Sequence, residues 1–299
     1  MKLTKGAIIM IDYTKILPDN IRSAIEKQTN KSLAQMQQNA YIPANNELFI
    51  DAVTALLLGK NVLLKGPTGS GKTKFAETLT ALFAQNMYSI NCSIDLDAES
   101  LIGFKTLTYE NNRQTISFVP GPVTKAMEEG TLLYIDEINM AKPETLPLIN
   151  GVLDYRRTVT NPFTNDIITA ARGFNVIAAI NEGYIGTVPL NEALKNRFIV
   201  IDVPYIDGQA LKEVIVAQTT MTDNRTIEQF IQLSADLVAA TEQGKLPEEA
   251  ASIRALLDAC DLAALIPIDR AIQRAIADKL TETRERQLVM NIAATIFNI

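Results

Sequence analysis

The chain has 299 residues, 47% hydrophobic and 21% charged, a composition typical of a folded globular protein. Its 28 basic and 34 acidic residues give a net charge of −6, which disfavours a protein built to coat nucleic acid. Histidine is absent, so catalytic triads with histidine and histidine-ligated metal sites are excluded. At about 150 residues per domain, the length predicts roughly two structural units.

The sequence predicts a cytoplasmic protein. No segment has the length and apolarity of a membrane-spanning helix, and the apolar run at 7–11 is too short for a signal peptide. Cys92 and Cys260 lie far apart in the sequence, which disfavours a disulfide framework or a zinc knuckle. We expect both to be buried thiols in a reducing compartment.

Apolar patterns divide the chain into three parts: an extension over 1–45 with a helix at 20–38, an α/β domain over 46–205 and a helical lid domain over 206–299. A helix from Glu47 that ends near Gly59 opens the second part. Short apolar runs, typical of parallel strands buried on both faces, follow at 62–65, 88–91, 131–135, 176–180 and 198–203. Helical patterns between most of them predict a parallel sheet between helices. After Pro204 the helices are predicted at 208–218, 227–241, 247–262, 267–279 and 285–297.

The most specific motif predicts a phosphate-binding loop between the first strand and the next helix. It matches G-x-x-x-x-G-K-[ST] and consists of Gly66, Pro67, Thr68, Gly69, Ser70, Gly71, Lys72 and Thr73. Glycines let backbone N–H groups converge on phosphates, and the N-terminus of the following helix favours the same negative charge. Lys72 would reach the β- and γ-phosphates, and the Thr73 hydroxyl would bind Mg²⁺. A chance glycine-rich loop is the alternative.

Two adjacent carboxylates follow the strand at 131–135. Asp136 is placed to hold Mg²⁺ beside Thr73, and Glu137 to orient and deprotonate an attacking water. A kinase would not need the second acid, so the pair favours hydrolysis. A surface turn is the alternative interpretation, which the apolar strand and the upstream phosphate loop disfavour.

Two polar residues continue this series. Asn181 ends the strand at 176–180 and is placed to contact the γ-phosphate or the attacking water, unless it only caps a turn. Arg197 ends a helix directly before the last strand and faces away from its own nucleotide. It is therefore placed to act on the γ-phosphate of a neighbouring subunit, or else to form a surface salt bridge.

These motifs resemble the AAA+ ATPases, and more closely their MoxR branch, which includes CbbQ/NorQ-type activators and gas-vesicle GvpN proteins. The resemblance covers about residues 40–299 and includes 183–186 and 252–254. It implies that Asn181 is sensor 1 and Arg197 the arginine finger. It also implies that Arg254 is the sensor 2 arginine, which contacts the γ-phosphate of its own subunit; a solvated helix arginine is the alternative. The extension over 1–45 has no counterpart in the family pattern.

Two insertions support the branch. Residues 104–119 and 157–171 carry strand and turn patterns, and each predicts a β-hairpin. In the family such hairpins line a central pore or the top of a ring and engage substrate; decorative loops are the alternative. Residues 41–43 are placed near the adenine by position alone.

We therefore expect an ATP- and Mg²⁺-dependent ATPase that assembles as a homo-oligomer, by resemblance a hexameric ring, and remodels or activates a partner protein. Family members often work with a partner that has a von Willebrand factor A domain. The alternative is a nucleic-acid motor of the dynein-like or McrB-like type. It needs basic residues at the hairpins, and Lys105, Arg113, Arg156, Arg157 and Arg172 give it limited support.

Overall fold

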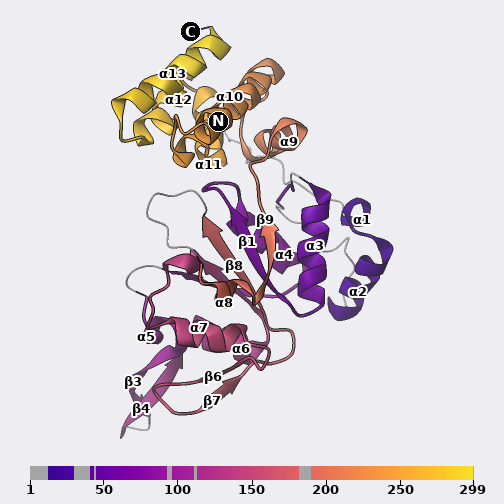
Figure 1. Ribbon diagram of the computed structural model, residues 1–299, viewed down its shortest axis with the longest axis vertical. Coiled ribbons are helices and arrows are strands. Elements are labelled where there is room, and N and C mark those ends of the chain that lie inside the picture. The colour runs from indigo at the N-terminus through magenta and orange to yellow at the C-terminus, as the bar shows by residue number, and fades with distance from the viewer. Residues whose placement is uncertain are drawn as a thin grey trace.

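A parallel sheet lies at the centre of the molecule, with helices on both faces (Figure 1). The computed structural model describes residues 13–29, 41–43, 45–92, 96–110, 113–181 and 190–298. The strands of this sheet are β1 (Asn61–Gly66), β2 (Met87–Asn91), β5 (Leu132–Asp136), β8 (Asn175–Asn181) and β9 (Phe198–Asp202). Their order is β2-β5-β8-β1-β9, and every predicted strand is among them. The predicted α/β class is confirmed.

Successive side chains of each strand face opposite layers, which gives the domain two cores. Leu64 packs toward α3 (Asn46–Leu57) and α4 (Lys72–Leu82). Leu63 packs toward the opposite layer. That layer contains α5 (Ala98–Ile102), α6 (Pro122–Glu129) and α7 (Leu146–Leu153). In β1, β5 and β8 both faces are buried, as the continuous apolar runs predict, whereas the outer strands β2 and β9 are partly exposed.

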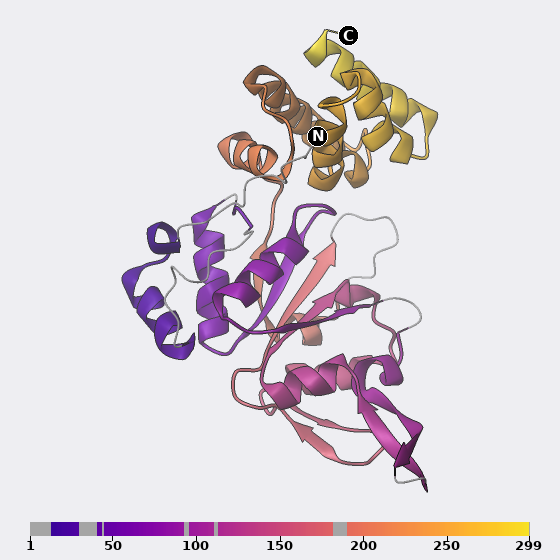
Figure 2. The same cartoon turned by 180° about the vertical axis from the view of Figure 1, so that it is seen from behind.

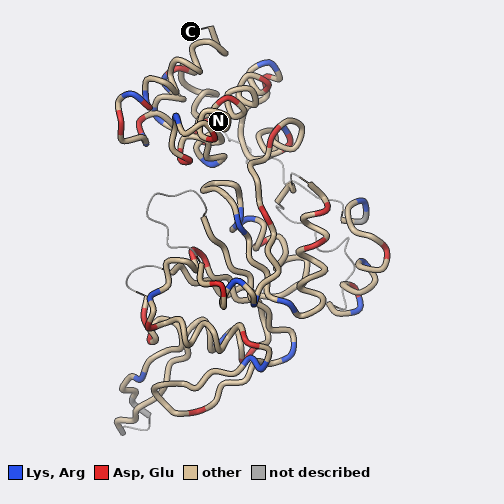
Figure 3. The backbone as a smooth tube through the Cα atoms, viewed as in Figure 1, with Lys and Arg blue, Asp and Glu red and all other residues tan. Residues whose placement is uncertain are grey.

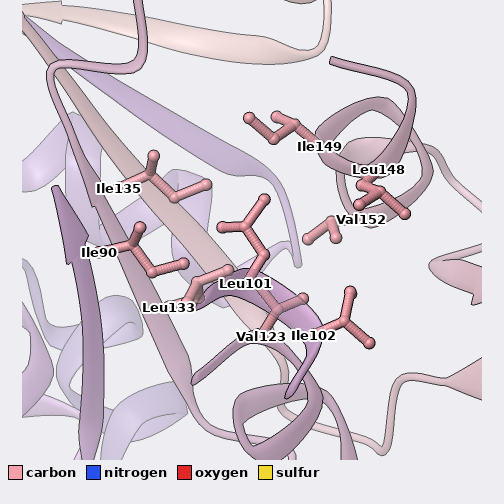
Figure 4. A pocket seen from close by; sticks show the side chains of 9 residues that line it. All are labelled: Ile90, Leu101, Ile102, Val123, Leu133, Ile135, Leu148, Ile149 and Val152. Carbon is pink, nitrogen blue, oxygen red and sulfur yellow. The ribbon is translucent and has the colours of Figure 1, made fainter. Parts of the chain in front are cut away.

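The second layer encloses a small apolar gap (Figure 4). Its volume is about 10 Å³, room for about one water molecule. Its lining is aliphatic throughout, so a water there would lack hydrogen-bond partners. The lining residues are Ile90, Leu101, Ile102, Val123, Leu133, Ile135, Leu148, Ile149 and Val152. This gap is part of the packed core and carries no chemistry.

The N-terminal extension is packed onto the α/β domain through α1 (Tyr13–Ile16) and α2 (Asp19–Thr29). The predicted helix starts within one residue of its expected position, and residues 30–40 lie outside the described part of the chain. A row of stacked rings joins α1 to the segment that enters the nucleotide site. The centroids of Tyr13 and Phe49 lie 5.8 Å apart, those of Phe49 and Phe75 5.9 Å, and those of Phe75 and Tyr41 4.7 Å.

Helices after residue 205 form a core of their own above the sheet (Figures 1 and 2). They are α9 (Gly208–Gln218), α10 (Asn224–Glu242), η3 (Glu248–Ala251), α11 (Ile253–Ala263), α12 (Ile268–Ala275), η4 (Ala277–Lys279) and α13 (Thr283–Phe297). Two of the predicted helices are wrong in extent, because each is divided into two shorter helices. The one at 247–262 is broken at Ser252, whose backbone is extended (φ −62°, ψ 123°). The one at 267–279 is broken at Ile276 (φ −120°, ψ −64°). The domain boundaries at 45 and 205 stay a proposal.

Both predicted hairpins are present, at the end of the molecule away from the helical lid (Figures 1 and 2). The first pairs β3 (Gly103–Glu110) with β4 (Arg113–Pro120). The second pairs β6 (Thr158–Thr160) with β7 (Ile167–Thr169). Their antiparallel pairing confirms that these insertions are hairpins.

Shortening Ile25 should destabilise the α/β domain, because its side chain is 0% exposed in the core shared by α2 and α3. We expect Ile25→Ala to lower the free energy of unfolding by about 2–5 kcal/mol, measured by urea denaturation. Gln28→Ala changes an exposed residue of the same helix and should have little effect. Equal stability of both variants would contradict the packing of the extension.

Candidate nucleotide site

The predicted phosphate loop connects the end of β1 to the start of α4. Gly71 precedes α4 with φ +92°, and a Cβ there would lie 3.2 Å from the Tyr41 ring. Glycine meets both constraints. No side chain of the described residues caps this helix, so its first N–H groups remain available to an anion.

Lys72 is buried at the loop, where its Nζ donates hydrogen bonds to the carbonyl oxygens of Gly66 (2.9 Å) and Pro67 (2.7 Å). Burial lowers the pKa of Lys72 to about 8, while the charges of Asp136, Glu248 and Glu137 oppose this shift. The ammonium thus lies at the phosphate loop, where a bound phosphate would complement its positive charge.

The carboxylates and Asn181 meet beside the loop, at the carboxyl edge of the sheet. β1 and β8 pair in parallel with Gly66 opposite Asn181, and β5 ends at Asp136. Asn181 Nδ2 donates to Glu137 Oε1 at 3.1 Å. The Glu137 backbone is left-handed (φ +52°), and its N–H donates to Asp136 Oδ1 at 3.1 Å. The structure therefore brings Asp136, Glu137 and Asn181 together.

Tyr134 is a member of this site that the sequence reading missed. Its hydroxyl lies 3.2 Å from Thr73 Oγ1. Burial raises the pKa of the Tyr134 phenol; its hydrogen bond with Thr73 opposes the rise, and the Asp136 charge adds to it. Tyr134 lies inside an apolar strand, where the sequence pattern predicts a core residue. Its phenol oxygen is the one feature in the sequence that could have indicated a polar role.

A cavity of about 460 Å³ joins these groups to the helical lid. Arg254, the second residue of α11, lines it on the lid side. Its other walls come from the phosphate loop, from Tyr41 and Ile42, and from lid residues that the sequence did not indicate. Those lid residues are Ile206, Val214, Gln218 and Leu257, and Ser252 and Ile253 of the predicted segment 252–254 line the cavity as well. This mostly apolar end suits a nucleobase, and the loop end suits phosphates.

The lid also touches the phosphate loop directly. The backbone N–H of Thr68 donates to Glu248 Oε2 at 2.9 Å. A Cβ on Gly69, where φ is +79°, would lie 2.4 Å from Ser252 Oγ. Thus the break between η3 and α11 fits against the tip of the loop.

Arg197 lies at the opposite end of the sheet, beside the amino ends of the strands. Phe198 pairs with Asn61 at the amino end of β1, so roughly 16 Å of strand separates this end from the loop, at about 3.3 Å per residue. Arg197 Nη1 donates to the carbonyl oxygen of Ala193. It lines a second cavity, of about 690 Å³, together with Lys60, Asp154 and Arg157.

The site's residues fit a nucleotide with Mg²⁺. Thr68 Oγ1 and Ser70 Oγ are buried at the loop and, within the described chain, have no hydrogen-bond partner. Thr73 and Asp136 have side-chain oxygens, the kind of ligand that Mg²⁺ prefers. The described part of the chain has no group of three or more His, Cys, Asp or Glu side chains that could hold a metal ion. In nucleotide sites phosphates and water complete the coordination of this ion.

Comparison with known proteins places this geometry in a family. The model of the AAA domain (dynein-related subfamily) matches residues 61–198, from the start of β1 to the start of β9. The chain is 57% identical over 286 residues to YojN of Bacillus subtilis (strain 168), covering 94% of each protein. It is 61% identical over 257 residues to SH1500 of Staphylococcus haemolyticus, covering 86% of this chain and 98% of that protein.

The chain belongs to the AAA+ ATPase family. This membership implies nucleotide binding. A crystal structure from Cytophaga hutchinsonii, assigned as an ATPase, is 18% identical and has the same fold, with a TM-score of 0.50 over 93% of this chain and 94% of that one. In the described part of the AAA+ chain, no helix is long and apolar enough to cross a membrane.

Nucleotide affinity should fall as the pH rises above 8. Lys72 has a pKa of about 8 in the free protein, and bound phosphates would favour its charged form, so binding takes up a proton above this pH. We expect ATP affinity to fall by up to about tenfold per pH unit there, measured with a fluorescent analogue. In Lys72→Met binding should be weaker and this dependence absent. An unchanged affinity up to pH 10 in the native protein would contradict the prediction.

Proposed function

We propose that this AAA+ protein hydrolyses ATP with Mg²⁺ and uses the energy, as a MoxR-type chaperone, to remodel or activate a partner protein. The hydrogen bond between Asn181 and Glu137 carries the proposal. It holds a carboxylate beside the phosphate loop, where a general base for an attacking water is needed. A kinase would instead have to admit a second substrate to this position.

Each site residue then has a role. The loop from Gly66 to Thr73 and the Lys72 ammonium hold the phosphates. Thr73 and Asp136 hold Mg²⁺, which when bound offsets negative charge on the β- and γ-phosphates. Glu137 accepts the proton of the attacking water, and Asn181 orients that carboxylate or the water itself. Arg254 reaches the γ-phosphate from the lid of the same subunit.

Arg197 would complete the site of a neighbouring subunit. Its place at the far edge of the sheet puts the phosphates of its own chain beyond the reach of one side chain. The cavity beside it has a basic lining, and the Arg197 charge adds to the hydrogen bonds from Arg156 that hold the pKa of Asp154 below its usual value. A guanidinium so placed supports a homo-oligomeric ring, hexameric by family resemblance.

The partner is best described as a protein. A von Willebrand factor A domain partner and a cytoplasmic location rest on the family resemblance and the sequence. A nucleic-acid motor is the weaker candidate. Figure 3 shows basic residues interleaved with acidic ones along the chain. Arg157 is engaged by the carbonyl of Gly59 (2.7 Å) and the side chain of Asn175 (3.1 Å), and Arg156 by Asp154 (3.0 Å).

Replacing the proposed base should separate binding from turnover. We expect Glu137→Gln to bind ATP normally and to lose at least about 10²-fold in hydrolysis, because the amide cannot accept the water's proton. Phosphate release and retention of labelled ATP measure the two steps. Glu144→Gln changes an exposed acid on the same loop and should hydrolyse normally. Full hydrolysis by Glu137→Gln would remove this residue from the role of base.

Replacing the proposed finger should leave ATP bound but uncleaved. We expect Arg197→Ala to lose about 10³–10⁵-fold in turnover, measured as phosphate release. Lys195→Ala, an exposed cation two residues away, is the control.

Mixing the two inactive variants tests whether sites are shared. A mixed oligomer contains interfaces where Glu137 of the Arg197→Ala subunit faces Arg197 of the Glu137→Gln subunit. Such interfaces are complete, so the mixture should regain part of the activity. A mixture that stays inactive although the subunits co-assemble would count against donation across the interface.

A further inference from the structure

The hydroxyl of Tyr134 is a buried polar group with a specific partner. The residue is 2% exposed and belongs to the apolar core between the sheet and α4. A phenol buried in this way needs a hydrogen-bond partner, since an unpaired hydroxyl would cost about 1–3 kcal/mol. The partner is Thr73 Oγ1, at 3.2 Å. The tyrosine thus contacts the residue that is to hold Mg²⁺.

The strand geometry brings Tyr134 close to the second metal ligand as well. Tyr134 and Asp136 are two residues apart on β5, so their side chains leave the same face of the sheet. Helix α4 packs on that face with Thr73 in its first turn. The phenol therefore contacts one of the two side chains proposed to hold the metal and shares a face of the sheet with the other.

We propose that Tyr134 is a positioning residue that orients the Thr73 hydroxyl toward Mg²⁺, an inference that rests on the proposed function. A threonine hydroxyl has one proton and two lone pairs. If the proton is donated to the phenol oxygen, both lone pairs of Thr73 point away from the core and toward the cavity. One buried oxygen then fixes the direction of the Thr73 hydroxyl, as outer-shell groups do at other metal sites.

Tyr134→Phe tests this role because it removes a single oxygen and keeps the ring in the core. Mn²⁺ replaces Mg²⁺ as the probe, and electron paramagnetic resonance measures free Mn²⁺ during titration of the full-length protein saturated with ADP. We expect the dissociation constant of Mn²⁺ to rise about 10–100-fold, as for other outer-shell substitutions. Affinity for ADP in EDTA should stay unchanged, since a structural defect would weaken both.

Tyr88→Phe is the matched control. It removes a phenol oxygen from the neighbouring strand β2, where the hydroxyl donates to Glu129 at 2.8 Å, and Mn²⁺ affinity should not change. Thr73→Ala provides a second test, because Tyr134 is proposed to act through Thr73. In that background Tyr134→Phe should cause no further loss of Mn²⁺ affinity.

The inference is overturned if Mn²⁺ binds the Tyr134→Phe complex as tightly as the native one, or if the loss is equally large without the Thr73 hydroxyl. These outcomes differ from a failure of the proposed function. A native protein that binds ADP and Mn²⁺ with the expected dependence on Tyr134, but does not cleave ATP, would refute the hydrolase and support the positioning role.

Discussion

The parallel register of β1, β5 and β8 is the constraint on which the site depends. It sets Gly66 opposite Asn181 and Ile135 opposite Ala178, so that Asp136 and Asn181 leave the same edge of the sheet on the α4 side. A slip of one residue would turn the side chains to the other face. Because both faces of these strands are buried, such a slip would also move the side chains of each core to the wrong side of the sheet, away from the helices that cover them. The packing of aliphatic residues thus holds the Asn181–Glu137 hydrogen bond in place.

The nucleotide site is formed by residues of both the α/β domain and the helical lid. Glu248 accepts the Thr68 N–H, and Ser252 lies against Gly69, so the break in the lid helix and the tip of the phosphate loop fit each other. The same break starts α11 so that Arg254 lines the cavity. A nucleotide in this cavity would touch both parts of the chain and so would connect the phosphates to the position of the lid.

The sheet also separates groups that are proposed to act on the same reaction. Its carboxyl edge has the loop, the carboxylates and Asn181, whereas Arg197 lies at the amino edge beside a second cavity. Because the length of a strand lies between them, one subunit has the nucleotide site at one end of the sheet and the proposed arginine finger at the other. The stacked rings from Tyr13 to Tyr41 connect the N-terminal extension to the nucleotide site, because Tyr41 lines the nucleotide cavity.

The sequence by itself determined the order of strands and helices, the phosphate loop and the acids after β5, because apolar periodicity and adjacent motifs are local properties of the chain. Local patterns did not locate the break at Ser252, because its extended backbone lies inside a run that reads as one helix. They also did not reveal the contact of Glu248 with Thr68, 180 residues away, or that of Tyr134 with Thr73. Only the tertiary structure decided these, because they arise where elements distant in the sequence pack together.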